Sequence, residues 1–152
     1  MPNLGFKPFR HPGGTPPVRE YLHSASDNAA IAAGDAVIVD GSYPGYVKIA
    51  LSNSATLLGV AQNSCAASTL GTVSVYDDPL TEFIGTCSGT SAQTVVNTDC
   101  DIEGGTGAMY VNENATTESV LHINELYDAA AANGQVVFVI KRHFKGNVPL
   151  TV

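Results

Sequence analysis

The apolar residues of this chain occur in short runs that are bounded by turn-forming residues. Residues 36–40 (AVIVD) lie between two Gly/Asp turns, and residues 72–76 (TVSVY) alternate strictly, with Val73 and Val75 on one face. Runs of this length suit strands better than helices, and frequent turn signals are typical of antiparallel proteins. The sequence therefore predicts a mostly-β fold, which is a compact β-barrel or β-sandwich of short antiparallel strands.

Further strands are expected along most of the chain. The run at 46–51 should form a hairpin with 36–40, and the run at 82–87 should return after the turn DDPL (77–80). The run at 135–144 is apolar through Ile140, which predicts a strand buried on both faces. The remaining expected strands are 56–62, 94–96, 108–111 and 119–123.

One short helix is expected before the last strand. Asn124 is a good N-cap, Glu125 follows at the positive end of the helix dipole, and Asn133-Gly134 is a C-cap signal. The residues ELYDAAAA between these signals are mostly strong helix formers. The sequence thus predicts a helix between Asn124 and Asn133.

Residues 1–17 contain five of the eight prolines. Because proline locks φ and removes a backbone donor, neither a helix nor a central strand is expected here. We therefore expect an extended N-terminal arm over residues 1–20, a β-rich domain over 21–145 and a C-terminal tail over 146–152. Since Phe6 and Phe9 are apolar, the arm needs a surface on which to lie. That surface is either a groove of its own domain or, in the interpretation we favour, a neighbouring subunit.

The charges are unevenly distributed along the chain. The formal net charge is −7, yet residues 49–140 contain ten acidic residues and neither Lys nor Arg. A body this acidic repels nucleic acid and anionic membranes, so neither is an expected partner. The basic residues lie near the two termini, where they could contact an acidic partner. No apolar run reaches the ~20 residues of a membrane helix and no signal-peptide core is present, which predicts a soluble protein made in a cytoplasm.

Motif searches give no arrangement that is typical of an enzyme. The four histidines form no HExxH or HxH motif, and GxSxG does not occur. GGTG (104–107) has no Lys nearby and is expected to be a hairpin turn rather than a phosphate loop. YDDP (76–79) is expected to be a turn rather than a pair of catalytic carboxylates. We therefore expect no enzymatic activity, no catalytic residue and no cofactor.

Two groups of residues are candidate metal ligands. Asp99, Asp101 and Glu103 alternate in DCDIE and would project to one side of a strand, where a hard cation such as Ca²⁺ could bind. Without an EF-hand loop, a solvated strand face is the preferred interpretation. The three cysteines form no CxxC motif, so no zinc site is expected, and the thiols should be reduced and mostly buried. They are Cys65, Cys87 and Cys100.

Several blocks resemble a family of structural proteins. GFKPFRHPGG (5–14) followed by Tyr21, GDAVIVDG (34–41) and LLGVAQNS (57–64) are similar to segments of small structural proteins of tailed phages. The most specific block is TVSVYDDPLTEFIG (72–85), whose V-x-V-x-D-D-P-x-x-x-F pattern resembles the capsid decoration, or cement, proteins of these phages. The resemblance spans residues 5–85 in scattered blocks and includes no catalytic motif.

The resemblance implies a virion protein that is made in the host cytoplasm, binds the outer surface of a capsid and bridges neighbouring subunits. Its partner would be the major capsid protein, and a homo-oligomer is implied, with a trimer favoured over a dimer. Many weak identical contacts of this kind would add up across a shell. The candidate capsid contacts are apolar and basic residues near the two ends of the chain: Phe6, Lys7, Phe9, Arg10, His11, Arg19, Lys141 and Arg142.

An alternative function is that of a virion surface adhesin, or head-fibre-type protein, that binds host glycan. Tyr43, Tyr46 and Tyr110 flank expected loops and could stack on sugar rings. Isolated tyrosines are more often half-buried packing groups, so we prefer the capsid-binding hypothesis.

Overall fold

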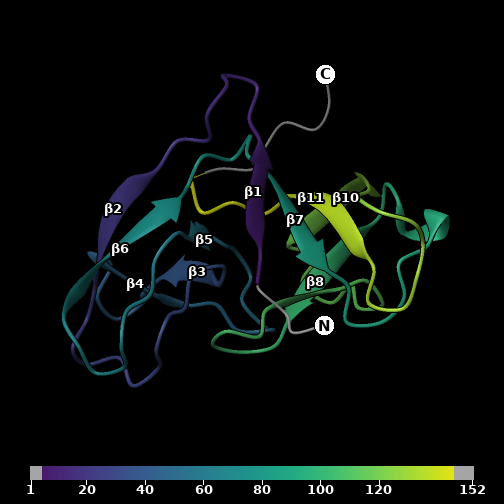
Figure 1. Cartoon of the computed structure of the whole chain (residues 1–152). Coiled ribbons are helices and arrows are strands. Elements are labelled where there is room, and N and C mark those ends of the chain that lie inside the picture. The colour runs from purple at the N-terminus through teal and green to yellow at the C-terminus, as the bar shows by residue number, and fades with distance from the viewer. Residues whose placement is uncertain (1–4, 146–152) are drawn as a thin grey trace.

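The computed structural model describes residues 5–145, which form strands and one short 3-10 turn (Figure 1). The predicted mostly-β class is therefore confirmed. Within this range no helix has the length and apolar character to cross a membrane. The elements are β1 (Lys7–Arg10), β2 (Arg19–His23), β3 (Ala36–Val39), β4 (Tyr46–Ile49), β5 (Gly59–Ala61), β6 (Gly71–Tyr76), β7 (Glu82–Thr86), the 3-10 turn η1 (Gln93–Val95), β8 (Asp99–Glu103), β9 (Tyr110–Asn112), β10 (Leu121–Leu126) and β11 (Gln135–Ile140).

Five strands close into a barrel in the order β2-β4-β3-β5-β6. β3 and β4 form the predicted hairpin, with Val37 opposite Ile49. β2 runs parallel to β4 and antiparallel to β6. Because the barrel is closed, its ladder has no open edge, and alternate side chains fill its interior. Val47, Val73 and Val75 are among these buried side chains.

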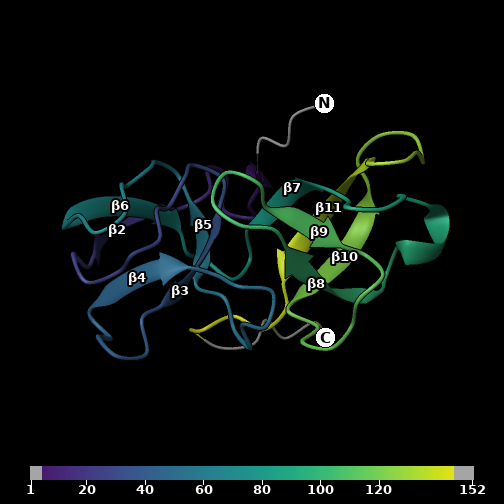
Figure 2. The same ribbon diagram turned by 90° about the horizontal axis from the view of Figure 1, so that it is seen from below.

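The other six strands form an antiparallel sheet in the order β1-β7-β11-β10-β8-β9. This sheet curls until Val111 of β9 bridges Cys87, which follows β7, and the Ser88 N–H donates to the Val111 carbonyl at 2.9 Å. Among the described strands, β1 is therefore the one whose outer edge has no bridge partner. The barrel and the sheet lie side by side, with β1 between them (Figures 1 and 2).

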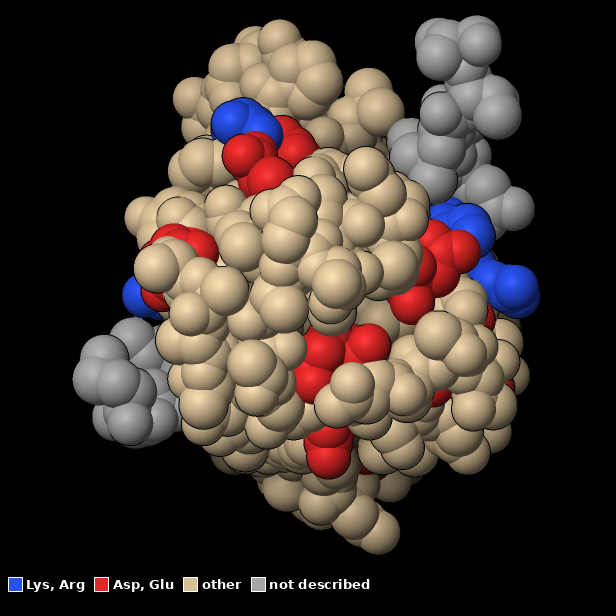
Figure 3. All heavy atoms as spheres, turned by 90° about the vertical axis from the view of Figure 1, so that its right-hand side faces the viewer, with Lys and Arg blue, Asp and Glu red and all other residues tan. Residues whose placement is uncertain are grey.

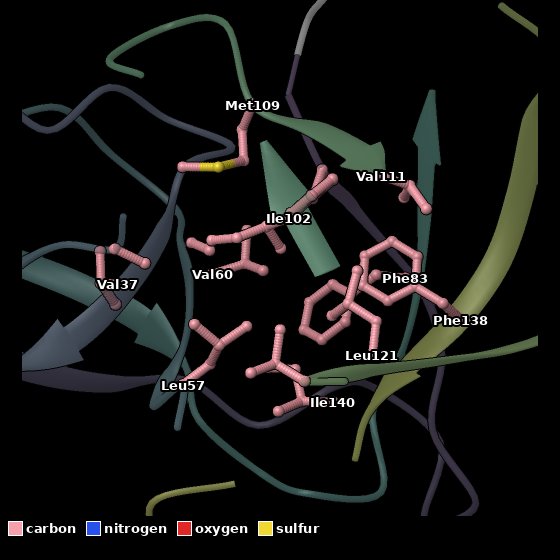
Figure 4. Packing of buried hydrophobic residues seen from close by; sticks show 14 of the residues in the cluster. Val37, Leu57, Val60, Phe83, Ile102, Met109, Val111, Leu121, Phe138 and Ile140 are labelled. Carbon is pink, nitrogen blue, oxygen red and sulfur yellow. The ribbon is translucent and has the colours of Figure 1, made fainter. Parts of the chain in front are cut away.

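One hydrophobic core extends through both halves of the molecule. Val37 and Val60 of the barrel face Phe83, Phe138 and Ile140 of the sheet across a shared interior (Figure 4). A contiguous buried cluster of this kind is the mark of a single folding domain. The predicted burial of the last strand on both faces is confirmed, because residues 136–140 of β11 are all buried.

The predicted helix between Asn124 and Asn133 is wrong. Leu121–Leu126 form β10 instead, and β10 pairs with β11 with Ile123 opposite Phe138. Burial in β10 alternates, which is the period of a strand, and packing against β11 outweighs the helix propensity of ELYDAAAA. Asn133, with φ 53°, lies in the connection between β10 and β11 rather than at a helix end.

Two further details differ from the sequence-based expectations. Residues 94–96 are not a strand, because Val95 closes a 3-10 turn by donating its N–H to the Ala92 carbonyl at 3.0 Å. Residues 82–86 do form a strand, β7, but β7 does not return along β6. The DDPL turn instead carries the chain from the barrel into the sheet, where β7 pairs with β1 and β11.

The described residues of the expected arm, 5–20, include strand residues of the domain and do not form a separate arm. β1 pairs with β7, and β2 is a barrel strand that crosses the expected boundary at residue 20. Phe6 is 2% exposed, and its ring centre lies 4.8 Å from that of Phe138. A side chain at Gly85 would collide with the Phe6 ring, so this glycine provides the space. The structure thus has Phe6 in its own domain, whereas the expected tail at 146–152 lies outside the described residues.

Candidate functional site

The candidate contact residues lie in several places. Phe6 is in the core, and the β1 residues Lys7, Phe9 and Arg10 continue into His11 on the surface. Arg19 begins β2, and Lys141 and Arg142 follow β11. The structure therefore brings the β1 residues together, and it places them against residues of β7 and β10 that sequence reasoning did not identify.

Phe9 forms an exposed aromatic pair with Tyr127. Phe9 is 38% exposed and Tyr127 is 49% exposed, and their rings meet edge to face with centres 5.7 Å apart. The Arg10 guanidinium lies 4.7 Å from the centre of the Phe9 ring, which is within cation–π range. No pattern in the sequence identifies Tyr127, because it lies within the segment ELYDAAAA, whose composition favours a helix.

Arg10 connects β1 to two strands of the sheet. Its guanidinium donates to the carboxylates of Glu82 in β7 and Glu125 in β10, and the Asn124 amide donates to Glu82 at 2.8 Å. The hydrogen bonds to Glu82 and Glu125 raise the pKa of Arg10. Burial alone would raise the pKa of Glu82, but the bonds from Arg10 and Asn124 outweigh it and lower that pKa. Arg10 is thus a fixed cation at physiological pH.

A surface groove of about 290 Å³ adjoins this ion pair. Its lining residues include Arg10, His11 and Pro12 of the N-terminal segment and Leu80, Glu82 and Asn124 of the sheet and the turn before it. Leu80 is 47% exposed, so the groove offers apolar surface beside charged groups. Together with the Phe9–Tyr127 pair, this groove forms what we call the β1 surface.

The Asp77 carboxylate, between the last barrel strand β6 and the first sheet strand after it, β7, faces three hydrogen-bond donors. This buried carboxylate accepts hydrogen bonds from the Tyr21 hydroxyl and the Lys145 ammonium, both at 2.5 Å, and lies 3.3 Å from Arg19 Nε. Burial and the Asp77 carboxylate raise the pKa of Tyr21. Burial lowers the pKa of Lys145, but the hydrogen bond to the Asp77 carboxylate raises it, and the pKa is raised overall. The expected turn at YDDP is confirmed by a different bond, in which the Thr81 N–H donates to the Asp78 carbonyl at 3.1 Å. Through Asp77 it also contacts Lys145, the last described residue.

The next residue of this turn, Asp78, faces His11 and His143. The Asp78 carboxylate lies 3.1 Å from His11 Nε2 and accepts the Leu80 N–H at 2.9 Å. Burial acts against ionisation, but these contacts together lower the pKa of Asp78. His143 is 3% exposed, and burial lowers its pKa. Its Nδ1 accepts the Lys145 N–H at 3.1 Å, whereas its Nε2 has no partner within residues 5–145.

Asp99, Asp101 and Glu103 do not act as one group. Asp99 accepts from His122 Nδ1 at 2.7 Å and from the Lys141 ammonium, and these contacts lower its pKa against the effect of burial. Asp101 is buried and accepts the N–H groups of residues 118 and 119, so the expectation of a solvated strand face is wrong for this residue. Glu103 is exposed. No group of side chains suited to a metal ion occurs within residues 5–145.

Most of the basic residues are neutralised by the body of the same chain. Arg10, Arg19, Lys141 and Lys145 each pair with an Asp or Glu. On the face in Figure 3, the Lys and Arg groups lie at the margins beside carboxylates. The acidic partner that the charge distribution suggested is thus, for these four residues, the protein's own surface.

The structure brings together two of the three tyrosines considered for glycan binding. Tyr43 and Tyr46 meet edge to face with ring centres 6.4 Å apart at the turn that precedes β4, and Tyr43 is 51% exposed. Tyr110 lies in β9 of the other sheet.

Comparison with known proteins adds no family assignment, because neither a protein-family model nor a curated protein matches the sequence.

Proposed function

We propose that this chain is a structural virion protein of a tailed phage that binds the outer surface of the capsid. In this proposal it resembles capsid decoration proteins in role and bridges neighbouring subunits of the major capsid protein. It acts as a homo-oligomer, either a trimer or a dimer, without a cofactor or enzymatic activity. It is made in the host cytoplasm and binds neither nucleic acid nor membrane.

The observation that carries the proposal is the spatial continuity of the blocks that resemble decoration proteins. The Phe6 N–H donates to the Gly34 carbonyl at 2.8 Å, and the Gly34 N–H donates to the Ala61 carbonyl at 2.8 Å. These bonds join the first three blocks, and the fourth contains β6 and β7, which pair with β5 and β1. Blocks scattered over residues 5–85 therefore form one connected unit, as a shared structural module would.

The β1 surface is the contact site that this function favours. Aromatic residues and arginine are enriched at the centres of protein interfaces, and Phe9, Tyr127 and Arg10 supply both kinds of group. β1 itself is a poor template for an added strand, because Pro8 lacks an N–H and the charged Lys7 and Arg10 flank it. A partner would therefore bind these side chains rather than extend the sheet.

Co-sedimentation with expanded capsids tests the proposal. The purified protein should bind in a saturable manner, and the double variant Phe9→Ala/Tyr127→Ala should lose at least about tenfold in affinity, since a buried aromatic pair contributes more than 1.4 kcal/mol. Tyr43→Ala, which removes an exposed aromatic group from the barrel, is the matched control and should bind normally. Absence of capsid binding, or tight DNA binding with a steep salt dependence, would contradict the proposal.

A second candidate function, glycan binding, rests on the Tyr43–Tyr46 pair. Exposed aromatic rings at a turn offer flat apolar faces to sugar rings. In a glycan-binding assay on host surface polysaccharide, this function predicts that Tyr43→Ala loses binding and that Phe9→Ala/Tyr127→Ala does not. The same pair of variants thus separates the two functions.

A further inference from the structure

Cys65, His23 and Asp27 form a linear array of side chains at one end of the barrel. Cys65 Sγ lies 3.4 Å from His23 Nδ1, and His23 Nε2 lies 2.8 Å from Asp27 Oδ2. The His23 ring is completely buried, and Asp27 is mostly buried at its side chain. A thiol in contact with an imidazole that is oriented by a carboxylate is the arrangement of an activated nucleophile. The motif search missed it because the thiol and the imidazole are 42 residues apart.

Each ring nitrogen of His23 faces an oxygen acceptor. Nε2 faces the Asp27 carboxylate, and Nδ1 lies 3.0 Å from the Thr69 carbonyl oxygen as well as next to the sulfur. Both oxygens are acceptors, so each contact is favourable only where the nitrogen carries hydrogen. His23 Nδ1 is therefore placed to exchange a proton with the Cys65 thiol, and Asp27 is placed to stabilise the ring when it carries a charge.

Cys65 is also the accessible cysteine of the three. It is partly exposed between the loops at 24–30 and 66–70, whereas Cys87 and Cys100 are buried in the other half of the molecule. Burial raises the pKa of Cys87 to about 12 and that of Cys100 further still. A Cβ atom at Gly71 would lie only 2.8 Å from the Cys65 sulfur, so the sulfur packs closely against this glycine.

We propose that Cys65 is a nucleophilic thiol that forms mixed disulfides with small disulfides such as oxidised glutathione. His23 Nδ1 takes the thiol proton, and the Cys65 sulfur attacks one sulfur of the disulfide. The new S–S bond forms as the old one breaks, and the leaving thiolate takes the proton from His23. One protein thiol and one small disulfide thus yield one mixed disulfide and one small thiol, with the small disulfide as the oxidant.

The modification is reversible but does not resolve within the chain. A resolving thiol would have to reach Cys65, and the other two cysteines are buried in strands of the sheet or directly beside them. The mixed disulfide therefore persists until an external thiol removes it. This inference goes beyond the proposed capsid-binding function and does not depend on it.

Intact-protein mass spectrometry during incubation with oxidised glutathione tests the proposal. The native protein should gain one glutathione, mapped to Cys65, and Cys65→Ser should gain none. An unassisted thiol, with a pKa near 8.5, loses close to a hundredfold of its thiolate between pH 8 and pH 6. The rate at Cys65 should fall by less than about tenfold over this range, whereas the chain unfolded in guanidinium should show the steep dependence.

Variants of the positioning residue make the test specific. Asp27→Asn keeps an acceptor for the Ala29 N–H, which Asp27 Oδ1 binds at 3.1 Å, but removes the charge that balances His23. It should restore the steep pH profile, as should His23→Gln if that variant melts cooperatively. Asp99→Asn is the matched control, because it alters a carboxylate–histidine contact of 2.7 Å that lies in the six-stranded sheet, whereas Cys65 contacts His23 of the barrel. A steep profile in the native protein, an unchanged profile in Asp27→Asn, or preferential modification of Cys87 would overturn the proposal.

Discussion

The carboxylate of Asp35, which is fully buried in the barrel, accepts the backbone N–H of Gly107 from the β8–β9 hairpin, at 3.1 Å to Oδ1. Asp35 also accepts the Ala32 N–H at 2.8 Å, and the Thr106 hydroxyl of the hairpin donates to the Ala30 carbonyl at 2.6 Å. GGTG is thus a hairpin turn, as the sequence predicts, and it fastens the sheet to the barrel. Gly107 adopts a φ of 72°, a left-handed backbone conformation that favours glycine.

Asp35→Ala should lower the free energy of unfolding by about 1–3 kcal/mol, because it leaves the N–H groups of the partly buried Ala32 and of Gly107 without their acceptor. Asp35→Asn keeps one acceptor oxygen and should cost less. Urea denaturation monitored by circular dichroism measures both effects. Equal stability of the alanine variant and the native protein would show that the hairpin is not held by this carboxylate.

Asp35 also predicts a pH dependence of known sign. Burial, more than any other cause, raises its pKa, so the folded state disfavours the charged carboxylate. The contribution of Asp35 to stability is therefore complete below the ordinary Asp pKa of about 3.9 and declines as pH rises through the higher folded value. The stability of the native protein minus that of Asp35→Asn should fall across this window. Taking the difference removes the opposite trend of Asp78, Glu82 and Asp99, whose pKa values are lowered.

His143 should make the protein less stable as pH falls below about 6.5. Because burial lowers its pKa, the unfolded chain binds a proton in a range where the folded protein does not. Stability is then lost toward acid with a slope of at most about 1.4 kcal/mol per pH unit for this one group. His143→Asn retains a side-chain acceptor for the Lys145 N–H and should flatten the profile between pH 5 and pH 7. An identical slope in both proteins would show that the pKa of His143 is the same in the folded and unfolded states.

Much of the fold could be predicted because strands carry their own local signal. Val73 and Val75 alternate inward as the sequence predicts, and the apolar run that ends at Ile140 is buried on both faces. The segment after Asn124 failed because local propensity and tertiary packing disagree there. ELYDAAAA favours a helix in isolation, but strand pairing with β11 buries Ile123 opposite Phe138, and no local pattern reports that pairing.

The candidate sites could not be predicted for a different reason. Arg10 and Glu125 are 115 residues apart in the sequence, and their contact exists only because β1 and β10 belong to one sheet, in which β7 and β11 lie between them. The arm was expected to bind a neighbour because its prolines exclude helices and central strands. An edge strand tolerates Pro8, however, and the space above Gly85 that receives Phe6 arises only on folding.

Phe6 and Phe9 should separate stability from capsid binding. Phe6→Ala removes a fully buried ring that packs on Phe138 and should cost about 3–5 kcal/mol. For a domain of this size that corresponds to a decrease in melting temperature of roughly 6–20 °C. Phe9→Ala, at an exposed ring, should lower the free energy of unfolding by only about 0.5–1.5 kcal/mol, through loss of its contact with Tyr127.

Capsid binding should show the reverse order, because Phe9 is exposed on the β1 surface and Phe6 is not. At a temperature where both variants remain folded, Phe9→Ala should bind expanded capsids more weakly than the native protein, and Phe6→Ala should bind almost normally. Deleting residues 1–10 combines the two changes and should lower both the melting temperature and the affinity. If residues 1–10 instead anchored on a neighbouring subunit, the deletion would leave the melting temperature of the free protein unchanged. Differential scanning calorimetry of the free proteins, together with co-sedimentation, distinguishes these outcomes. An unchanged melting temperature for Phe6→Ala would contradict the placement of Phe6 in the core.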